Sequence, residues 1–238
     1  MIDYKEILQE GEKGLYFEDN NSESCPGFSW IDSIKWIEHQ PAVYANLAKT
    51  LVKEFPNAKQ ILELGCGPGC LSYYIKHYGE DIEIVTLDIN ADAPLKSPFL
   101  GKNHFLCYTD KPYQIQKDNE DCKFDLIISY EHFEHIPPKN LSVFLNNIKK
   151  HCHENTIINC TASIAETKGV KWLTKDQDIT KVGDNNFASH QSVFFREQWS
   201  EILDKSGFEL LEDKYITGFN KPPNFRLEAT IELTFKLK

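Results

Sequence analysis

The feature that most constrains this chain is an apolar run that ends in three alternating glycines. Residues 61–64 read Ile-Leu-Glu-Leu and predict a buried strand, and Gly65, Gly67 and Gly69 follow directly. The apolar positions between residues 71 and 78 then recur with helical spacing. Strand, tight glycine loop and helix form the first unit of a doubly wound α/β sheet, which binds its ligand at the amino terminus of the helix.

The spacing of the glycines argues against a dinucleotide as that ligand. A dinucleotide fingerprint has glycines at the first, third and sixth positions of the loop, and the sixth position counted from Gly65 is Cys70. Glu63, just before the loop, is a poor neighbour for a pyrophosphate and a suitable one for a cation. An acidic residue followed by G-x-G-x-G resembles motif I of the class I S-adenosylmethionine-dependent methyltransferases. This resemblance implies that the cofactor is S-adenosylmethionine and that its methionine part is held by Glu63, Gly65, Cys66, Gly67 and Gly69.

A second acidic residue lies at the distance that such a site requires. Residues 82–88 predict the next parallel strand, and its last residue, Asp88, lies 23 positions after Gly65. Carboxylates about 20 residues beyond the glycine loop bind ribose hydroxyls in Rossmann-like sites. An acid at the end of the second strand is also the second hallmark of the family. We therefore expect Asp88 to bind the ribose, with Ile89 beside it.

The third strand is predicted at residues 104–108. The family resemblance implies that the two residues after it, Thr109 and Asp110, hold the adenine. Residues 111–122 are polar, and we expect them to form a surface segment.

Residues 124–130 predict a fourth strand, apolar enough to be central in the sheet. The run Phe-Asp followed by apolar residues resembles motif IV of the same family. The resemblance implies that Ser129 and Tyr130 lie at the carboxyl edge, beside the methyl group that is transferred. Asp125, near the start of the strand, is assigned a structural role.

An E-x-x-E-H-I segment follows and leaves two interpretations. On a helix, Glu131, Glu134 and His135 would share one face, and two carboxylates with an imidazole could ligate a divalent metal. The methyltransferases that modify the 3′ ends of small RNAs bind a metal with such a segment and a distant histidine, for which His190 is the candidate here. Many metal-free members carry the same residues to cap a helix and line the pocket. We favour the metal-free interpretation, with His135 and His190 as candidate general bases.

Charge and composition limit the partners. The formal net charge is −10 and the isoelectric point is about 5.3, which disfavours nucleic acid as a partner. No run approaches the roughly 18 apolar residues of a membrane span, and the amino terminus has no signal-peptide pattern. The seven cysteines form no C-x-x-C pair, which is typical of free thiols in a reducing compartment. We expect a cytoplasmic protein without membrane association.

The remaining pattern completes one domain. Helices are predicted at residues 41–55, 139–151 and 196–206, and strands at residues 156–160, 208–211 and 224–237. The family resemblance implies an α/β, Rossmann-like doubly wound sheet of seven strands, flanked by helices, with the order 3-2-1-4-5-7-6 and an antiparallel last strand. We expect residues 41–238 to form this methyltransferase domain.

Two further segments are assigned to the acceptor. Residues 1–40 are rich in aromatic side chains and are expected to form an extension that covers the cofactor and substrate pocket, although they could instead cover a sheet edge. Residues 161–189 form a long polar stretch, and loops of such length are often functional lids.

The predicted function is transfer of a methyl group from S-adenosylmethionine to an oxygen or nitrogen of a small-molecule acceptor. Two alternatives stay open: a metal-dependent 2′-O-methyltransferase of small-RNA 3′ ends, and a cofactor-binding protein without turnover. The sequence specifies neither the acceptor nor the oligomeric state.

Overall fold

The computed structural model describes residues 6–9, 41–79, 81–89, 101–117, 120–164, 166–167, 170–171, 192–216 and 229–238. His190, all but residues 6–9 of the predicted N-terminal extension, and most of the predicted polar lid lie outside the described residues. None of the helices in the described ranges has both the length and the apolar character that a membrane crossing requires.

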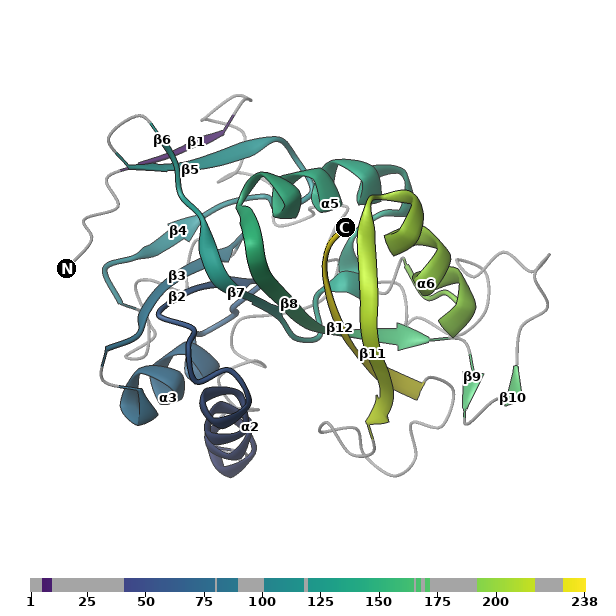
Figure 1. Ribbon diagram of the computed structural model, residues 1–238, viewed down its shortest axis with the longest axis horizontal. Helices are drawn as coiled ribbons and strands as arrows, with labels where there is room; N and C mark the ends of the chain where they lie inside the picture. Colours follow the sequence, from purple (N-terminus) through teal and green to yellow (C-terminus); the bar gives the residue numbers. More distant parts are fainter. Residues whose placement is uncertain are drawn as a thin grey trace.

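A seven-stranded mixed sheet forms the centre of the molecule, in the order β11-β12-β8-β7-β2-β3-β4 (Figure 1). The strands are β2 (Gln60–Leu64), β3 (Glu83–Asp88), β4 (His104–Leu106), β7 (Phe124–Ser129), β8 (Cys152–Ile164), β11 (Phe208–Ile216) and β12 (Ala229–Leu237). Strand β12 runs antiparallel to β8 and β11, and the other neighbouring strands of this sheet pair in parallel. Counted along the chain within the sheet, the order is 3-2-1-4-5-7-6, which confirms the predicted topology.

Helices cover both faces of the sheet. On one face, α2 (Pro41–Glu54) and α3 (Cys70–Tyr78) pack on apolar side chains of β2, β3 and β7. On the other, α5 (Leu141–Lys150) and α6 (Arg196–Lys205) complete a larger apolar cluster with β7, β8 and β12. Helix α5 does so with Leu141, Phe144, Leu145 and Ile148, the i, i+3, i+4, i+7 stripe of an amphipathic helix. This three-layer arrangement leaves the carboxyl ends of the parallel strands at a common edge.

The prediction of a polar surface segment at residues 111–122 is wrong. These residues form β5 (Tyr113–Lys117) and β6 (Glu120–Asp121), a hairpin that pairs with β1 (Glu6–Gln9) beside α5 (Figure 1). Tyr113 and Ile115 alternate with polar residues and are fully buried. His151 packs against this hairpin. Its ring stacks on Tyr113 with centroids 5.6 Å apart, and its Nδ1 lies 2.8 Å from the carbonyl oxygen of Cys122.

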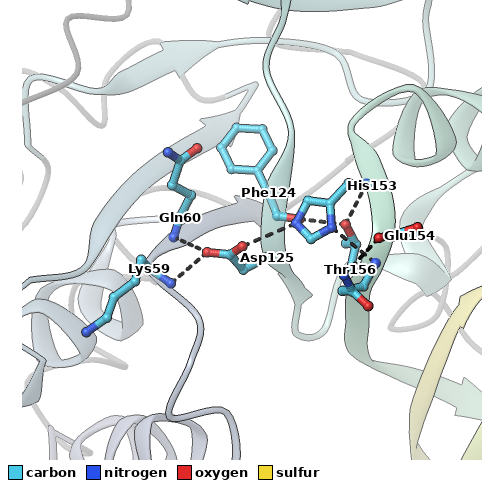
Figure 2. A network of polar contacts seen from close by, with 8 residues as sticks. Lys59, Gln60, Phe124, Asp125, His153, Glu154 and Thr156 are labelled. Carbon is cyan, nitrogen blue, oxygen red and sulfur yellow. Dashed lines mark hydrogen bonds and ion pairs between the residues drawn. The ribbon is translucent and has the colours of Figure 1, made fainter.

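At the amino-terminal edge of the sheet, the carboxylate of Asp125 connects neighbouring strands (Figure 2). Its Oδ2 accepts hydrogen bonds from the backbone N–H groups of Lys59, at 2.8 Å, and Gln60, at 2.9 Å, and its Oδ1 lies 3.2 Å from Nε2 of His153. Burial alone would raise the pKa of Asp125, but these hydrogen bonds outweigh it and hold the pKa below its usual value. Asp125 therefore connects the starts of β2, β7 and β8, in agreement with the structural role assigned to it.

Replacing Asp125 by alanine should destabilise the fold. The Asp125→Ala variant should lose about 2 kcal/mol of unfolding free energy in urea denaturation, because two backbone donors lose a charged acceptor. Asp204→Ala is the matched control. The Asp204 side chain is 70% exposed and contacts Lys238 in a surface ion pair, so its loss should cost less than about 1 kcal/mol. Equal losses in the two variants would contradict the structural role.

Candidate functional site

The glycine loop at residues 65–69 begins where β2 ends and is tied to β3. The N–H groups of Gly65 and Cys66 both donate to the carbonyl oxygen of Leu87, at 2.8 and 3.1 Å. The φ angles of Gly65, Gly67 and Gly69 are 67°, 52° and 81°. All three angles lie in the left-handed region, which residues other than glycine avoid. The loop therefore turns sharply into α3, whose amino terminus faces the carboxyl edge of the sheet.

Asp88 is brought to the loop by the pairing of β2 with β3. Its Oδ2 accepts a hydrogen bond of 2.7 Å from the N–H of Gly67. Asp88 and the following Ile89 are both partly exposed at the carboxyl edge. The structure thus brings together the glycine loop and Asp88, which lies 23 residues after Gly65 in the sequence. The contact of Asp88 and Ile89 with the ribose stays a prediction.

Glu63 lies beneath the loop. Its side chain is 4% exposed, and its carboxylate accepts a hydrogen bond from the hydroxyl of Ser72 on α3. Burial raises the pKa of Glu63 to about 7; the hydrogen bond from Ser72 opposes this shift and the charge of Asp88 adds to it. Because Glu63 is buried beneath the loop backbone, it can interact with a ligand above the loop electrostatically.

The charges that act around the loop are negative. Burial raises the pKa of the Cys66 thiol, and the carboxylates of Asp88 and Glu63 raise it further. Burial also raises the pKa of Tyr44 on α2, and the charges that add to this shift come from Cys70, Glu63 and Glu131. A site surrounded in this way favours a cationic ligand and repels phosphate.

Ser129 and Tyr130 lie at the carboxyl edge of β7, as predicted. Ser129 is fully buried and donates its hydroxyl to the carbonyl oxygen of Leu64 at 3.1 Å. The hydroxyl of Tyr130 donates to Oδ1 of Asn159 on β8. Both hydroxyls therefore connect β7 to its neighbours, and a contact of either residue with the cofactor stays a prediction.

Residues 131–135 do not form the helix on which Glu131, Glu134 and His135 would share one face. Among the described residues, Glu131 is the only non-glycine residue with a positive φ, 53°. Its N–H donates to Oγ1 of Thr161 on β8 at 2.7 Å. A single 3₁₀ turn, Phe133–His135, follows, and α5 begins only at Leu141. Because a left-handed residue interrupts the helix, Glu131 does not share a helical face with Glu134 and His135.

The described residues do not assemble a metal centre. Within the described ranges, no group of three or more His, Cys, Asp or Glu side chains could hold a metal ion. Glu134 is fully buried and accepts a hydrogen bond of 3.3 Å from the hydroxyl of Ser163, and His135 is half-buried at the end of the 3₁₀ turn. Ser192 donates its N–H to the carbonyl oxygen of Glu134 at 2.9 Å.

Sequence analysis missed His132. Its Nε2 lies 2.8 Å from Oγ1 of Thr109. A Cβ added to Gly65 would lie only 2.4 Å from Cγ and Nδ1 of its ring. Burial and, to a smaller extent, the neighbouring His135 lower the pKa of His132 to about 3, so the imidazole is neutral. His132 is one of the variable positions of E-x-x-E-H, so the motif held no signal for it.

The segment predicted to hold the adenine is firmly fixed beside His132. Thr109 and Asp110 are both buried. The carbonyl of Thr109 accepts a hydrogen bond of 3.0 Å from the amide of Asn147, and Oδ2 of Asp110 accepts one of 2.8 Å from the amide of Asn140. The structure therefore brings Thr109 and Asp110 to the same edge as the glycine loop, although one oxygen of Asp110 is already occupied.

This arrangement agrees with the relationships of the chain. Residues 36–213 match the family described as "Methyltransferase domain". The chain belongs to this methyltransferase family. The prediction that the chain is a class I methyltransferase is thereby confirmed. A search of curated proteins finds no match.

Solved structures of methyltransferases share the fold. A TehB-like SAM-dependent methyltransferase from Corynebacterium glutamicum is 16% identical with a TM-score of 0.57, over 87% of this chain and 97% of that one. The O-methyltransferase from a Brevibacillus brevis trans-AT PKS multienzyme, in complex with S-adenosyl-L-homocysteine, is 16% identical with a TM-score of 0.58, over 90% and 81%. TehB from Haemophilus influenzae is 16% identical with a TM-score of 0.56; the match covers 81% of this chain but only 62% of TehB.

The glycine loop of this methyltransferase supplies a matched pair of variants. Gly65→Ala would force Cβ into the His132 ring, whereas a Cβ at Gly67 meets no atom within 4 Å. Both substitutions carry the left-handed backbone penalty, about 1–2 kcal/mol. Gly65→Ala should therefore lower the melting temperature of the ligand-free protein clearly more than Gly67→Ala. Equal shifts in differential scanning calorimetry would contradict the contact between His132 and the loop.

Proposed function

We propose that the protein transfers the methyl group of S-adenosylmethionine to a nitrogen or oxygen of a small-molecule acceptor. The observation that carries this proposal is a left-handed glycine loop at the start of α3, with the carboxylate of Asp88 bound to the Gly67 N–H and the buried carboxyl group of Glu63 just before the loop. S-adenosylmethionine presents a sulfonium and an ammonium, which such a field attracts. A pyrophosphate would be repelled by the same charges.

The proposed roles of the individual residues follow from their positions at the carboxyl edge of the sheet. The backbone of Gly65, Cys66, Gly67 and Gly69 would contact the methionine part, and the open space above Gly67 supports a close approach there. Glu63 would balance the positive charge from below. Asp88 and Ile89 would hold the ribose, Thr109 and Asp110 the adenine, and Ser129 and Tyr130 the side from which the methyl leaves.

The chemistry requires mainly positioning. When bound, S-adenosylmethionine supplies a methyl group that is already electrophilic. The chain then has to hold the acceptor atom in line with the methyl carbon and exclude water, and such alignment can supply much of the acceleration. A general base is needed only for a weakly acidic hydroxyl or amine, and His135 and His190 remain the candidates.

Several observations favour a small acceptor. The net charge of −10 disfavours a polyanionic substrate. The Brevibacillus brevis neighbour is an O-methyltransferase from a trans-AT PKS multienzyme, which supports an acceptor other than nucleic acid. We further propose that residues 1–40 and the polar stretch at 161–189 complete the acceptor pocket.

Gly67 offers a direct test of the cofactor site. Because a Cβ at Gly67 meets no protein atom, a loss of cofactor affinity in Gly67→Ala would report the approach of the ligand. Isothermal calorimetry should show S-adenosylhomocysteine binding weakened by about tenfold or more, since both the added methyl and the changed loop backbone oppose binding. Gly101→Ala, which also meets no atom, should bind as the wild type does. Unchanged affinity in Gly67→Ala would overturn the assignment of the loop.

The raised pKa of Glu63 predicts a pH dependence. Below pH 7, Glu63 is mostly protonated in the free protein. A bound cation favours its ionised form, so binding should release a proton. The affinity for S-adenosylmethionine should therefore rise several-fold between about pH 5.5 and about pH 7. Glu63→Gln keeps an acceptor for Ser72 and should flatten this rise. A wild-type affinity that is constant over this range would contradict the proposed role of Glu63.

A further inference from the structure

His132 lies between two segments that are assigned to different parts of the cofactor. On one side, the Cγ and Nδ1 atoms of its ring lie so close to Gly65 that a Cβ added there would be 2.4 Å from both. On the other side, its Nε2 lies 2.8 Å from Oγ1 of Thr109. Gly65 belongs to the loop assigned to the methionine part, and Thr109 belongs to the segment assigned to the adenine. One side chain therefore contacts both segments.

The ring of His132 is held in place by the core. It makes an edge contact with the ring of Phe144 on α5, with centroids 5.9 Å apart and an interplanar angle of 65°. Phe144 is fully buried, and the ring of Phe133 packs on it as well, with centroids 4.8 Å apart. The carbonyl oxygen of His132 also accepts a hydrogen bond of 3.0 Å from the N–H of His135. The position of the imidazole is thus set by protein contacts.

The segment after β4 is fixed by side chains as well as by the sheet. Cys107 follows the last residue of β4 and donates its N–H to a carbonyl oxygen of β3 at 2.8 Å. Beyond it, the amide of Asn147 on α5 donates to the carbonyl oxygens of Thr109, at 3.0 Å, and Lys111, at 2.8 Å. Asn147 therefore fixes this segment relative to α5, and His132 fixes it relative to the glycine loop.

The bond between His132 and Thr109 is a hydrogen bond between neutral groups. Because the pKa of His132 is lowered to about 3, mainly by burial, its imidazole carries one N–H and one bare nitrogen. The hydroxyl of Thr109 can donate or accept, so the bond forms with either tautomer of the ring. The contact therefore persists at neutral pH without a compensating charge.

We propose that His132 is a positioning residue of the cofactor site, which sets the place of the adenine segment relative to the glycine loop by binding the Thr109 hydroxyl while its ring packs on Gly65. This inference rests on the proposed function, because it uses the parts of the cofactor assigned there to the two segments. S-adenosylmethionine spans both segments. Fixing them relative to one another before the cofactor arrives reduces the ordering that binding requires.

Two matched pairs of variants test the hydrogen bond. Thr109→Val removes the hydroxyl at nearly constant volume, whereas Thr109→Ser keeps it. His132→Asn places an amide near the position of Nδ1 and ends short of Thr109, whereas His132→Gln can place its amide near the position of Nε2. Calorimetry should show S-adenosylhomocysteine binding weakened about fivefold in Thr109→Val and His132→Asn, and by no more than about twofold in Thr109→Ser and His132→Gln. Thr50→Val, which loses an exposed hydroxyl on α2 that donates to a carbonyl of its own helix, should bind as the wild type does.

The double variant separates positioning from direct contact with the ligand. If His132 acts through Thr109, the variant with both Thr109→Val and His132→Asn loses the same hydrogen bond once, and its affinity should again be about fivefold below the wild type. If the two side chains contact the cofactor separately, their effects add to a loss of about 25-fold. An additive loss would therefore overturn the inference.

Hydrogen exchange gives a second measurement on the folded protein. The N–H of Lys111 donates to the carbonyl oxygen of Tyr108 at 3.2 Å. In ligand-free Thr109→Val this amide should exchange faster than in the wild type, and S-adenosylhomocysteine should restore its protection, while the amides of β2 exchange as before. Unchanged exchange at Lys111 together with unchanged affinity in Thr109→Val would overturn the inference. Failure of the wild type to bind S-adenosylhomocysteine would instead overturn the proposed function.

Discussion

The close packing of β2 between β3 and β7 is the constraint on which the site depends. It brings the Leu87 carbonyl to the N–H groups of Gly65 and Cys66, and the Asp88 carboxylate to the N–H of Gly67. The chain must then turn into α3 within five residues, which requires left-handed backbone at three of them. On the other side, the His132 ring occupies the volume that a side chain at Gly65 would need. The glycines are thus fixed by protein contacts before any ligand is considered.

The same packing creates an unfavourable electrostatic situation. Glu63 is buried beneath the loop, and its pKa is about 7 because burial, with a smaller contribution from the charge of Asp88, raises it against the hydrogen bond from Ser72. Burying carboxylates near one another lowers stability unless a cation or hydrogen bonds compensate. Ser72 compensates only in part. A bound sulfonium and ammonium would compensate the charge further, which agrees with the proposed cationic ligand.

The parts of the fold that sequence patterns predicted are those set by local rules. The apolar runs of β2, β3 and β7 and the alternating glycines each carry a signal within a few residues. The hairpin β5–β6 was missed because it is held by a distant residue: Nε2 of His151, 36 positions away, accepts a hydrogen bond from the Ile115 N–H. His132 was missed for the same reason, since its partner Thr109 is 23 positions away. The helical face that Glu131, Glu134 and His135 could have shared does not form, because Glu131 is left-handed and its N–H binds Thr161, 30 positions later.

The residues that sequence patterns could not place lie in the segment after β7. In class I methyltransferases the donor site is set by motif I and the acid after the second strand, both of which are local. The segment after β7 in this protein depends instead on hydrogen bonds with β8. Thr161 and Ser163 are small polar residues whose side chains are ordinary in a strand, and only pairing in space gives them a role. The strained backbone of Glu131 is the one local sign of that role, and it is visible only in the folded chain.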